Sequence, residues 1–270
     1  MPSVNDNHAV WGQSYDWSAA GDEWSAAWGG TTSEWYSTVL PRIQAHLPAA
    51  SILEIATGHG RWTEQLIPYC TQFVGVDLAT SCIEACERRF ADIAHARFVV
   101  NDGRSLPGVE DESVDFAFSF ESLVHCDLGV LAAYGTELSR VLKPGGVAFL
   151  HHSNLGQHSR ALRSSHGLGR LARSSEKLST RLKSAQLIGW DHWRAPDVTA
   201  DRTAEVFTAA GLRCLGQEVV NWGSRWTIDC FTRVGREPLA MAAAGRVVNH
   251  RFMDEVESSR LSTASRPTSV

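Results

Sequence analysis

The sequence lacks the features that mark several classes of protein. No run of apolar residues approaches the ~20 that a membrane-spanning helix needs. The first thirty residues include Asp6, Asp16, Asp22 and Glu23, where a secretory signal would be hydrophobic. The 25 Lys and Arg are outnumbered by 30 Asp and Glu, so the chain has no excess of basic residues for binding a polyanion. We therefore expect a cytoplasmic protein that binds neither membranes nor nucleic acid.

Closely spaced cysteine pairs are also missing. None of the six cysteines has the two-residue spacing of a zinc ribbon or a thioredoxin-like site. Cys82 and Cys86 are four residues apart on a predicted helix, a spacing that suits two small core residues. We expect no metal in the site.

The composition is that of a globular protein. Hydrophobic residues make up 43% of the 270 residues and charged residues 20%. This length fits one large domain or two small ones. From residue 51 onward, short β-branched or aromatic runs alternate with helical patterns, which is typical of a parallel sheet with crossover helices. The predicted strands are 52–55, 73–77, 96–100, 114–120, 147–150, 213–220 and 227–234, the last two as a hairpin, and the clearest helices are 81–90, with a Ser81–Glu84 capping box, 128–142 and 200–210.

We divide the chain into five parts. An aromatic-rich N-terminal part (1–50) ends in a helix over 33–47, and a core (51–155) follows. An insert (156–195) carries eight basic residues against two acidic ones, and is interpreted as a substrate-recognition element or a solvated helix face. Residues 196–236 complete the sheet, and 237–270 are expected to form a loosely ordered tail.

Polar and glycine residues follow three of the predicted strands. The first strand runs into Glu54-Ile55-Ala56-Thr57-Gly58-His59-Gly60, whose glycines allow backbone to approach a ligand ahead of a helix N-terminus. Asp77 ends the second strand, where a carboxylate can accept both ribose hydroxyls of an adenosine. Asn101-Asp102-Gly103 ends the third, and Leu142-Lys143-Pro144-Gly145-Gly146 introduces the fifth.

With these motifs, residues 51–155 resemble the core of class I S-adenosylmethionine-dependent methyltransferases. The resemblance implies an α/β fold, with a Rossmann-like, seven-stranded, mostly parallel sheet, an antiparallel last strand and helices on both faces. It also implies S-adenosylmethionine as the cofactor. The residues expected to bind it are Glu54, Ala56, Gly58, Gly60, Asp77, Leu78, Asp102, Gly103 and Phe120. Ala56 departs from the family pattern, because it stands where the family usually has its first glycine.

The segment after the fourth strand carries a candidate base. Residues 118–127 read Phe-Ser-Phe-Glu-Ser-Leu-Val-His-Cys-Asp, similar to a Glu-Ser-Leu-His-His run in rebeccamycin-type sugar O-methyltransferases. His125 matches the second histidine of that run, and Val124 replaces the first. His151 and His152 end the fifth strand, where alternation sends their side chains to opposite faces; His152 is the second candidate base. Asp127 and Glu121 leave a divalent-metal site as an alternative.

Aromatic residues supply candidates for binding the acceptor. Stacked indoles of a lid would exclude water and hold a planar or glycosidic molecule, whereas Trp24, Trp28 and Trp35 have a spacing that also fits a helix face packed on the core. The candidates are Trp11, Tyr15, Trp24, Trp28, Trp193 and Trp222.

These observations predict an enzyme that transfers a methyl group to a hydroxyl of a small, glycosidic or natural-product-like acceptor. The alternatives are a small-molecule N-methyltransferase, a nicotinamide-dependent oxidoreductase and a cofactor-binding protein without catalysis. The absence of an Asn/Asp-Pro-Pro-aromatic motif after the fourth strand argues against methylation of adenine or glutamine. The oligomeric state is left open.

Overall fold

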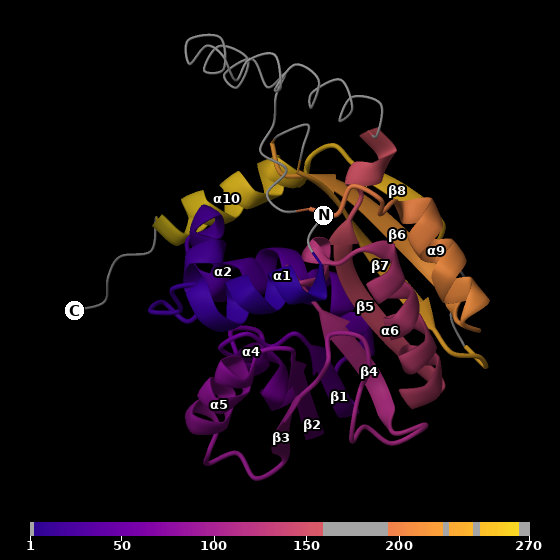
Figure 1. Cartoon of the computed structure of the whole chain (residues 1–270). Coiled ribbons are helices and arrows are strands. Elements are labelled where there is room, and N and C mark those ends of the chain that lie inside the picture. The colour runs from indigo at the N-terminus through magenta and orange to yellow at the C-terminus, as the bar shows by residue number, and fades with distance from the viewer. Residues whose placement is uncertain (1–2, 159–193, 224–226, 240–243, 265–270) are drawn as a thin grey trace, which may run out of the picture.

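Eight strands form one central sheet in the computed structural model, which describes residues 3–158, 194–223, 227–239 and 244–264. Their order across the sheet is β3-β2-β1-β4-β5-β7-β6-β8 (Figure 1). The strands are β1 (Ala49–Ile55), β2 (Cys70–Asp77), β3 (Ala96–Val100), β4 (Val114–Ser119), β5 (Leu142–Ser153), β6 (Arg213–Asn221), β7 (Ile228–Gly235) and β8 (Arg246–Asn249).

The first five strands pair in parallel, and β7 runs antiparallel to both of its neighbours, β5 and β6. The predicted mostly parallel sheet with an antiparallel strand near its end is confirmed. The predicted number of strands is wrong, because β8 adds an eighth strand, parallel to β6.

Helices connect the strands and lead into the sheet. They are α1 (Val4–Ala9), α2 (Thr31–Glu34), α3 (Leu40–Ile43), α4 (Thr63–Leu66), α5 (Thr80–Arg89), α6 (Leu128–Val141), α9 (Ala200–Ala209) and α10 (Phe252–Ala264). Short 3₁₀ or π turns lie at Val10–Ser14, Asp22–Trp28, Trp35–Val39, Gln44–His46, Ile67–Tyr69, Leu123–His125 and Leu155–His158. None of the described helices has the length and apolar character needed to cross a membrane.

The structure contains the predicted N-terminal helix but not the predicted capping box. The helix over 33–47 is present as a helical run from Thr31 to His46, interrupted by a π turn at Trp35–Val39. The capping box is wrong: α5 begins after Ala79, and no side chain caps it. The Ser81 hydroxyl instead donates to the Gly12 carbonyl oxygen at 3.1 Å, which ties the N-terminal segment to α5.

Alternating residues of each central strand pack on opposite faces of the sheet. In β1, Leu53 joins a cluster that includes Leu131 and Leu138 of α6 and Phe207 of α9. Its neighbour Ile52 joins the other cluster, with Leu66 of α4 and the aromatic residues of the N-terminal part. Figure 1 shows α6 and α9 together on one side of the sheet. The carboxyl ends of the parallel strands remain available for a site.

The expectation of a loosely ordered tail is wrong for the described residues beyond 236, because β8 and α10 pack on the core. Phe252 is buried among aromatic side chains, and Arg42 binds the carboxylate of Glu218 through two nitrogens at 2.7 and 2.8 Å. Arg42 also reaches Glu255 of α10 at 3.1 Å, and Asn249 of β8 donates to both carboxylates. Arg42 therefore joins α10 to β6, and Arg246 of β8 adds hydrogen bonds to Gln217 of β6.

We expect Arg42→Met to lower the free energy of unfolding by about 2 kcal/mol, because it leaves two partly buried carboxylates without their cation. Chemical denaturation measures this change. The matched control is Arg251→Met, which removes an exposed pair with Asp254 and should cost less than about 1 kcal/mol. Equal losses in the two variants would contradict this role of Arg42.

Candidate active site

A cavity of about 450 Å³ lies at the carboxyl ends of the parallel strands. The turns after β1, β2, β3 and β4 form its walls together with the N-terminal segment. Seven predicted site residues that follow these strands line it: Ala56, Gly58, Asp77, Leu78, Gly103, Phe120 and His125. The position agrees with the general rule that open α/β sheets bind ligands at the carboxyl ends of their strands.

Asp77 holds the glycine-containing turn against the end of β2. Its buried carboxylate accepts hydrogen bonds from the backbone N–H groups of Gly58 and Ala79, both at 2.8 Å. Burial raises the pKa of Asp77, while these hydrogen bonds and that of Leu78 act to lower it. The turn after β1 and the turn after β2 are thereby joined at one carboxylate.

The turn has left-handed backbone at three positions, Ala56, Gly58 and Gly60. Gly58 has φ +54°, and a Cβ there would lie 2.9 Å from the Trp17 ring, so only glycine allows this ring to pack directly on the turn. Ala56, which replaces the usual glycine, adopts φ +64°. This conformation costs an alanine roughly 1–2 kcal/mol and keeps the path of the turn.

Three predicted cofactor residues lie outside the cavity wall. Glu54 is buried and accepts a hydrogen bond from Thr63 of α4 at 2.5 Å. A Cβ on Gly60 would meet Phe90, so Gly60 permits close packing of the turn on α5. Asp102 is exposed, and its Oδ1 accepts bonds from the N–H groups of the turn that follows it, while its neighbours Asn101 and Gly103 line the cavity.

The three candidate histidines occupy different environments. His125 lies in the cavity wall, 5.1 Å from Trp11 between ring centroids. His152 does not line the cavity: Nδ1 donates to the Ser153 carbonyl oxygen at 2.8 Å, and Nε2 lies 2.7 Å from the Thr232 hydroxyl. Burial lowers the pKa of His152 to about 4, so it is neutral with both nitrogens engaged.

His151 points to the other face of β5, as alternation predicts. Its Nδ1 accepts from the Glu121 backbone N–H at 3.0 Å, and Nε2 lies 3.2 Å from Asp229. Burial alone would raise the pKa of Asp229, but the charge of Arg194 and the bond to His151 outweigh it and hold that pKa low. His151 thus binds the backbone of the loop after β4. Of the three candidate histidines, only His125 lies in the cavity wall.

Four aromatic rings of the N-terminal segment form a cluster beside the cavity: Trp11, Tyr15, Trp17 and Trp24. Trp11, Trp17 and Trp24 line the cavity, whereas Tyr15 packs behind them on the other three rings. Trp17 stacks on His59 at 4.6 Å. The Asn7 side chain donates to the His125 carbonyl oxygen at 3.0 Å, so the segment is tied to the loop that carries His125.

The other predicted aromatic residues lie elsewhere. Trp28 is 1% exposed and packs on Trp222 and Phe252, which agrees with the core-face alternative for this residue. Trp222 stacks on His151 and does not line the cavity. Trp193, like most of the basic insert, is outside the described residues.

Sequence reasoning missed Arg61, which lines the cavity and binds Ser25 at 2.6 Å and Glu121. These partners lie 36 and 60 positions away, so local patterns carry no signal for the contacts. It also missed Tyr134, which accepts a hydrogen bond from Asn101 at 3.0 Å. Asn101, which also lines the cavity, stands directly before Asp102 in the motif at the end of β3, so its sequence position could have indicated it.

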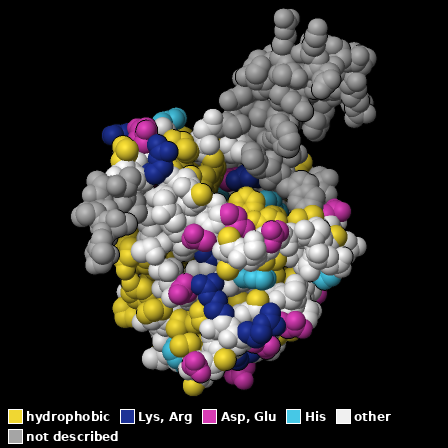
Figure 2. Space-filling model, turned by 90° about the vertical axis from the view of Figure 1, so that its left-hand side faces the viewer, with side chains coloured by type: hydrophobic (Ala, Val, Ile, Leu, Met, Phe, Trp, Pro, Cys, Tyr) yellow, Lys and Arg dark blue, Asp and Glu magenta, His cyan; other side chains and the backbone are white. Residues whose placement is uncertain are grey.

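The metal alternative gains no support from the described part of the chain, where no group of three or more His, Cys, Asp or Glu is arranged to hold an ion. Asp127 caps α6 by accepting from Val130 N–H at 2.9 Å, and Glu121 pairs with Arg61. The acidic and basic side chains on the face drawn in Figure 2 are interspersed rather than gathered into one charged area.

Residues 52–146 match a family model described as a methyltransferase domain. This segment of the chain therefore resembles a methyltransferase domain. S-adenosylmethionine is the cofactor of such a domain, and the fold and cofactor expected from the sequence are in accord with this match.

Two curated relatives resemble parts of the chain. Nodulation protein S of Rhizobium tropici is 28% identical over 129 residues, which are 47% of this chain and 53% of that protein. The biotin biosynthesis bifunctional protein BioHC of Cellvibrio japonicus is 33% identical over 118 residues, 44% of this chain and 22% of that one. The chain thus spans about half or less of the length of these relatives.

A solved structure shares the fold. The N-methyltransferase NodS of Bradyrhizobium japonicum WM9, in complex with S-adenosyl-L-homocysteine, aligns with a TM-score of 0.52 at 16% identity and covers 75% of this chain and 86% of that one. This likeness shows a shared fold over three quarters of the chain.

The cavity suits the amphipathic cofactor. Its wall combines apolar rings and side chains, among them Trp17, Leu78 and Phe120, with the Asp77 carboxylate and the Asn101 side chain. Apolar walls with a few fixed polar groups are typical of cofactor sites of this volume.

The buried Glu54 makes stability depend on pH. Burial raises its pKa to about 8, and the Thr63 bond only partly offsets this. The unfolded chain releases this proton above about pH 4.3. The contribution of Glu54 to the free energy of unfolding is therefore complete below that pH and is lost as the pH rises through about 8.

Glu54→Gln stays neutral, so between pH 6.5 and 9 it should lose about 2 kcal/mol less stability than the parent protein. Thermal or chemical denaturation at the two pH values measures the difference. The exposed Glu110→Gln is the control and should follow the parent curve. A Glu54→Gln protein that also follows the parent curve would show that Glu54 does not retain its proton.

Proposed function

We propose that this protein transfers the methyl group of S-adenosylmethionine to a hydroxyl group of a small, glycosidic acceptor, with His125 as the base. The observation that carries the proposal is a single cavity that joins the Asp77-bound glycine turn to the loop of His125. The methyltransferase domain match supports the methyl transfer.

The cofactor, when bound, supplies a methyl group that is already electrophilic because it is carried on a sulfonium. Asp77 would accept the ribose hydroxyls, and the turn at Gly58, which lines the cavity, would bring backbone groups close to the ligand. Asn101 and Gly103 line the part of the wall expected to meet adenine. Contact of the cofactor with Glu54, Gly60 and Asp102 remains a prediction. The residues of this chain therefore have three further tasks: orientation, exclusion of water and removal of the acceptor's proton.

His125 is the side chain best placed for the proton. It is the one of the three candidate histidines that lines the cavity, and the N-terminal segment holds its loop through Asn7. A well-placed general base accelerates a reaction by typically 10²- to 10⁴-fold.

The aromatic cluster would cover the site and bind the acceptor. Trp11 and Trp24 face the cavity with extended apolar rings, against which the apolar face of a sugar or a planar aglycone can pack. Their rings also displace water from the site. Trp193 remains a predicted contact of the acceptor, whereas Trp222 packs on Trp28 and His151 outside the cavity wall.

Methylation of an amine is the second candidate function, favoured by the similarity to NodS, whose solved structure is described as that of an N-methyltransferase. A neutral amine needs orientation more than a base. The two functions therefore differ in their dependence on His125.

We expect His125→Ala to lower kcat for methyl transfer by 10²- to 10⁴-fold, because the acceptor hydroxyl loses its base. Affinity for S-adenosylhomocysteine should change little. Mass spectrometry of glycosidic acceptors incubated with S-adenosylmethionine measures the transfer as a single added methyl group.

His95→Ala serves as the matched control, since His95 is exposed and does not line the cavity. It should retain the parent turnover. A His125→Ala protein with parent turnover on a hydroxyl acceptor would overturn the assignment of the base, and methylation of amines alone would favour the second candidate.

A further inference from the structure

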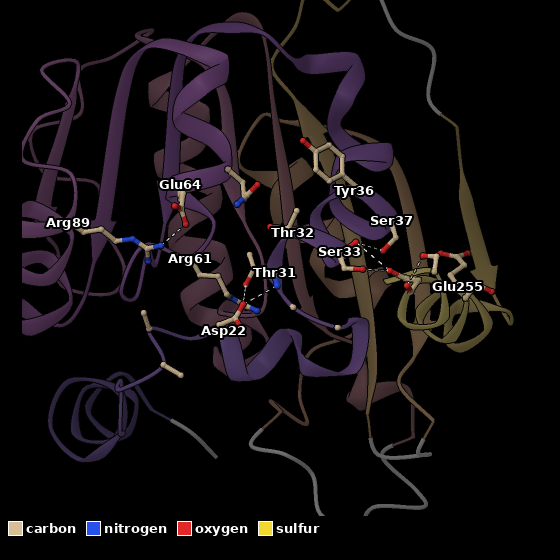
Figure 3. Close-up of a pocket in the computed structure, with 18 residues that line it drawn as sticks. Asp22, Thr31, Thr32, Ser33, Tyr36, Ser37, Arg61, Glu64, Arg89 and Glu255 are labelled. Carbon is tan, nitrogen blue, oxygen red and sulfur yellow. Dashed lines mark hydrogen bonds and ion pairs between the residues drawn. The ribbon is translucent and has the colours of Figure 1, made fainter. Parts of the chain in front are cut away.

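Arg61 is part of the walls of two cavities. It lines the cavity of the candidate active site and also a larger groove of about 830 Å³. Figure 3 shows this groove, with Arg61 beside Asp22 and Thr31, and Glu255 of α10 across from them. The guanidinium packs on the Trp62 ring at 4.4 Å, and its side chain is only 10% exposed. A cation this buried needs a compensating charge.

Two carboxylates approach this guanidinium. Glu121 forms a direct ion pair with Arg61 Nη2, whereas the fully buried Glu34 lies 3.6 Å from Nη1. Burial, reinforced by the charge of Glu121, raises the pKa of Glu34 well above its ordinary value. Glu121 is thus the carboxylate in direct contact with Arg61, while Glu34 lies farther away.

The backbone of Glu121 is fixed by a hydrogen bond to His151 of β5. Its backbone has φ +61°, a left-handed conformation that costs a residue with a Cβ roughly 1–2 kcal/mol. Its N–H donates to His151, which binds Asp229, and Asp229 pairs with Arg194 at 2.7 Å. Strain of this kind persists only where the surrounding structure imposes it, and it is frequent at functional sites.

Both members of the Arg61–Glu121 pair, and Arg194 of the second pair, line the cavity, whereas Asp229 is buried behind it. Glu121 and Arg194 line the wall together with the segment 120–126, which includes His125. Each pair is internally neutral, yet the Arg61–Glu121 pair offers strong hydrogen-bond donors and acceptors. A neutral, hydroxylated molecule can accept a hydrogen bond from Arg61 and donate one to Glu121. A carboxylate has no proton to donate and would be repelled by the carboxylate of Glu121.

We infer that Glu121 is a specificity-determining residue, which pairs with Arg61 to select neutral hydroxylated acceptors over acceptors that carry a carboxylate. His151 is a positioning residue that acts through the backbone of Glu121. The inference rests on the proposed function, because that function assigns the part of the cavity beside His125 to the acceptor.

The test compares two probes, methyl β-D-glucopyranoside and the corresponding methyl glucuronide, on the full-length protein saturated with S-adenosylhomocysteine. The parent protein should bind the neutral glycoside at least tenfold more tightly by calorimetry or saturation-transfer NMR. Glu121→Gln removes the carboxylate in direct contact with Arg61, so the variant should lose this preference or bind the glucuronide more tightly. The Glu110→Gln control should keep the parent ratio.

A second variant tests the pairing without a glycoside. In Glu121→Ala, acetate should occupy the space of the missing carboxylate and raise the Tm, while the isosteric acetamide should not. The parent protein should respond to neither additive.

The inference is overturned if the parent protein binds neither glycoside or prefers the glucuronide. It is equally overturned if Glu121→Gln keeps the parent ratio, or if acetate and acetamide act alike on Glu121→Ala. Failure of the proposed function has a different signature: S-adenosylhomocysteine fails to bind the parent protein, or no hydroxyl acceptor gains a methyl group.

Discussion

The site depends on one buried carboxylate at the end of β2. Asp77 accepts hydrogen bonds from Gly58 of the turn after β1 and from Ala79 at the start of α5. Three segments therefore meet at two carboxylate oxygens, and the burial of this charge is compensated by backbone dipoles rather than by a cation. The turn held in this position provides, at Gly58, the surface on which the Trp17 ring packs.

The N-terminal segment completes the cavity that the sheet leaves open. Asn7 ties it to the loop of His125, Ser81 of α5 ties it to the core at Gly12, and the Trp17 indole binds the Trp11 carbonyl oxygen at 2.8 Å. These polar contacts fix where the aromatic rings lie. The same segment continues into Arg42, which joins α10 to β6. One region thus covers the candidate site and anchors α10.

Much of this arrangement follows from local sequence patterns. The strand runs and the polar residues at their ends predict that Gly58, Asp77 and the 120–126 loop meet at one edge, because parallel strands end together. Local patterns could not separate Trp24, which lines the cavity, from Trp28, which is core, since both fit one helix face. The distinction depends on the contacts of Trp28 with Trp222 and Phe252, which are far away in the sequence.

Local sequence patterns also gave no indication of two other features: the ion pair of Arg61 with Glu121, and strand β8. Arg61 finds its partners across the fold, and the backbone of Glu121 adopts a conformation that its side chain does not favour. β8 has only four residues, three of them exposed, so it lacks the alternation that identifies a strand. It is held by pairing with β6 and by the network around Arg42.

The most direct test of this account is calorimetric titration with S-adenosylhomocysteine, compared with NAD. The account predicts saturable binding of S-adenosylhomocysteine, none of NAD, and at least tenfold weaker binding to Asp77→Asn, whose amide nitrogen cannot accept from Gly58. Asp115→Asn should bind as the parent does, because Asp115 lies at the opposite end of the sheet and bonds to Ser51 and Lys143. Binding of NAD in place of S-adenosylhomocysteine, or equal affinity in the Asp77 variant, would contradict the account.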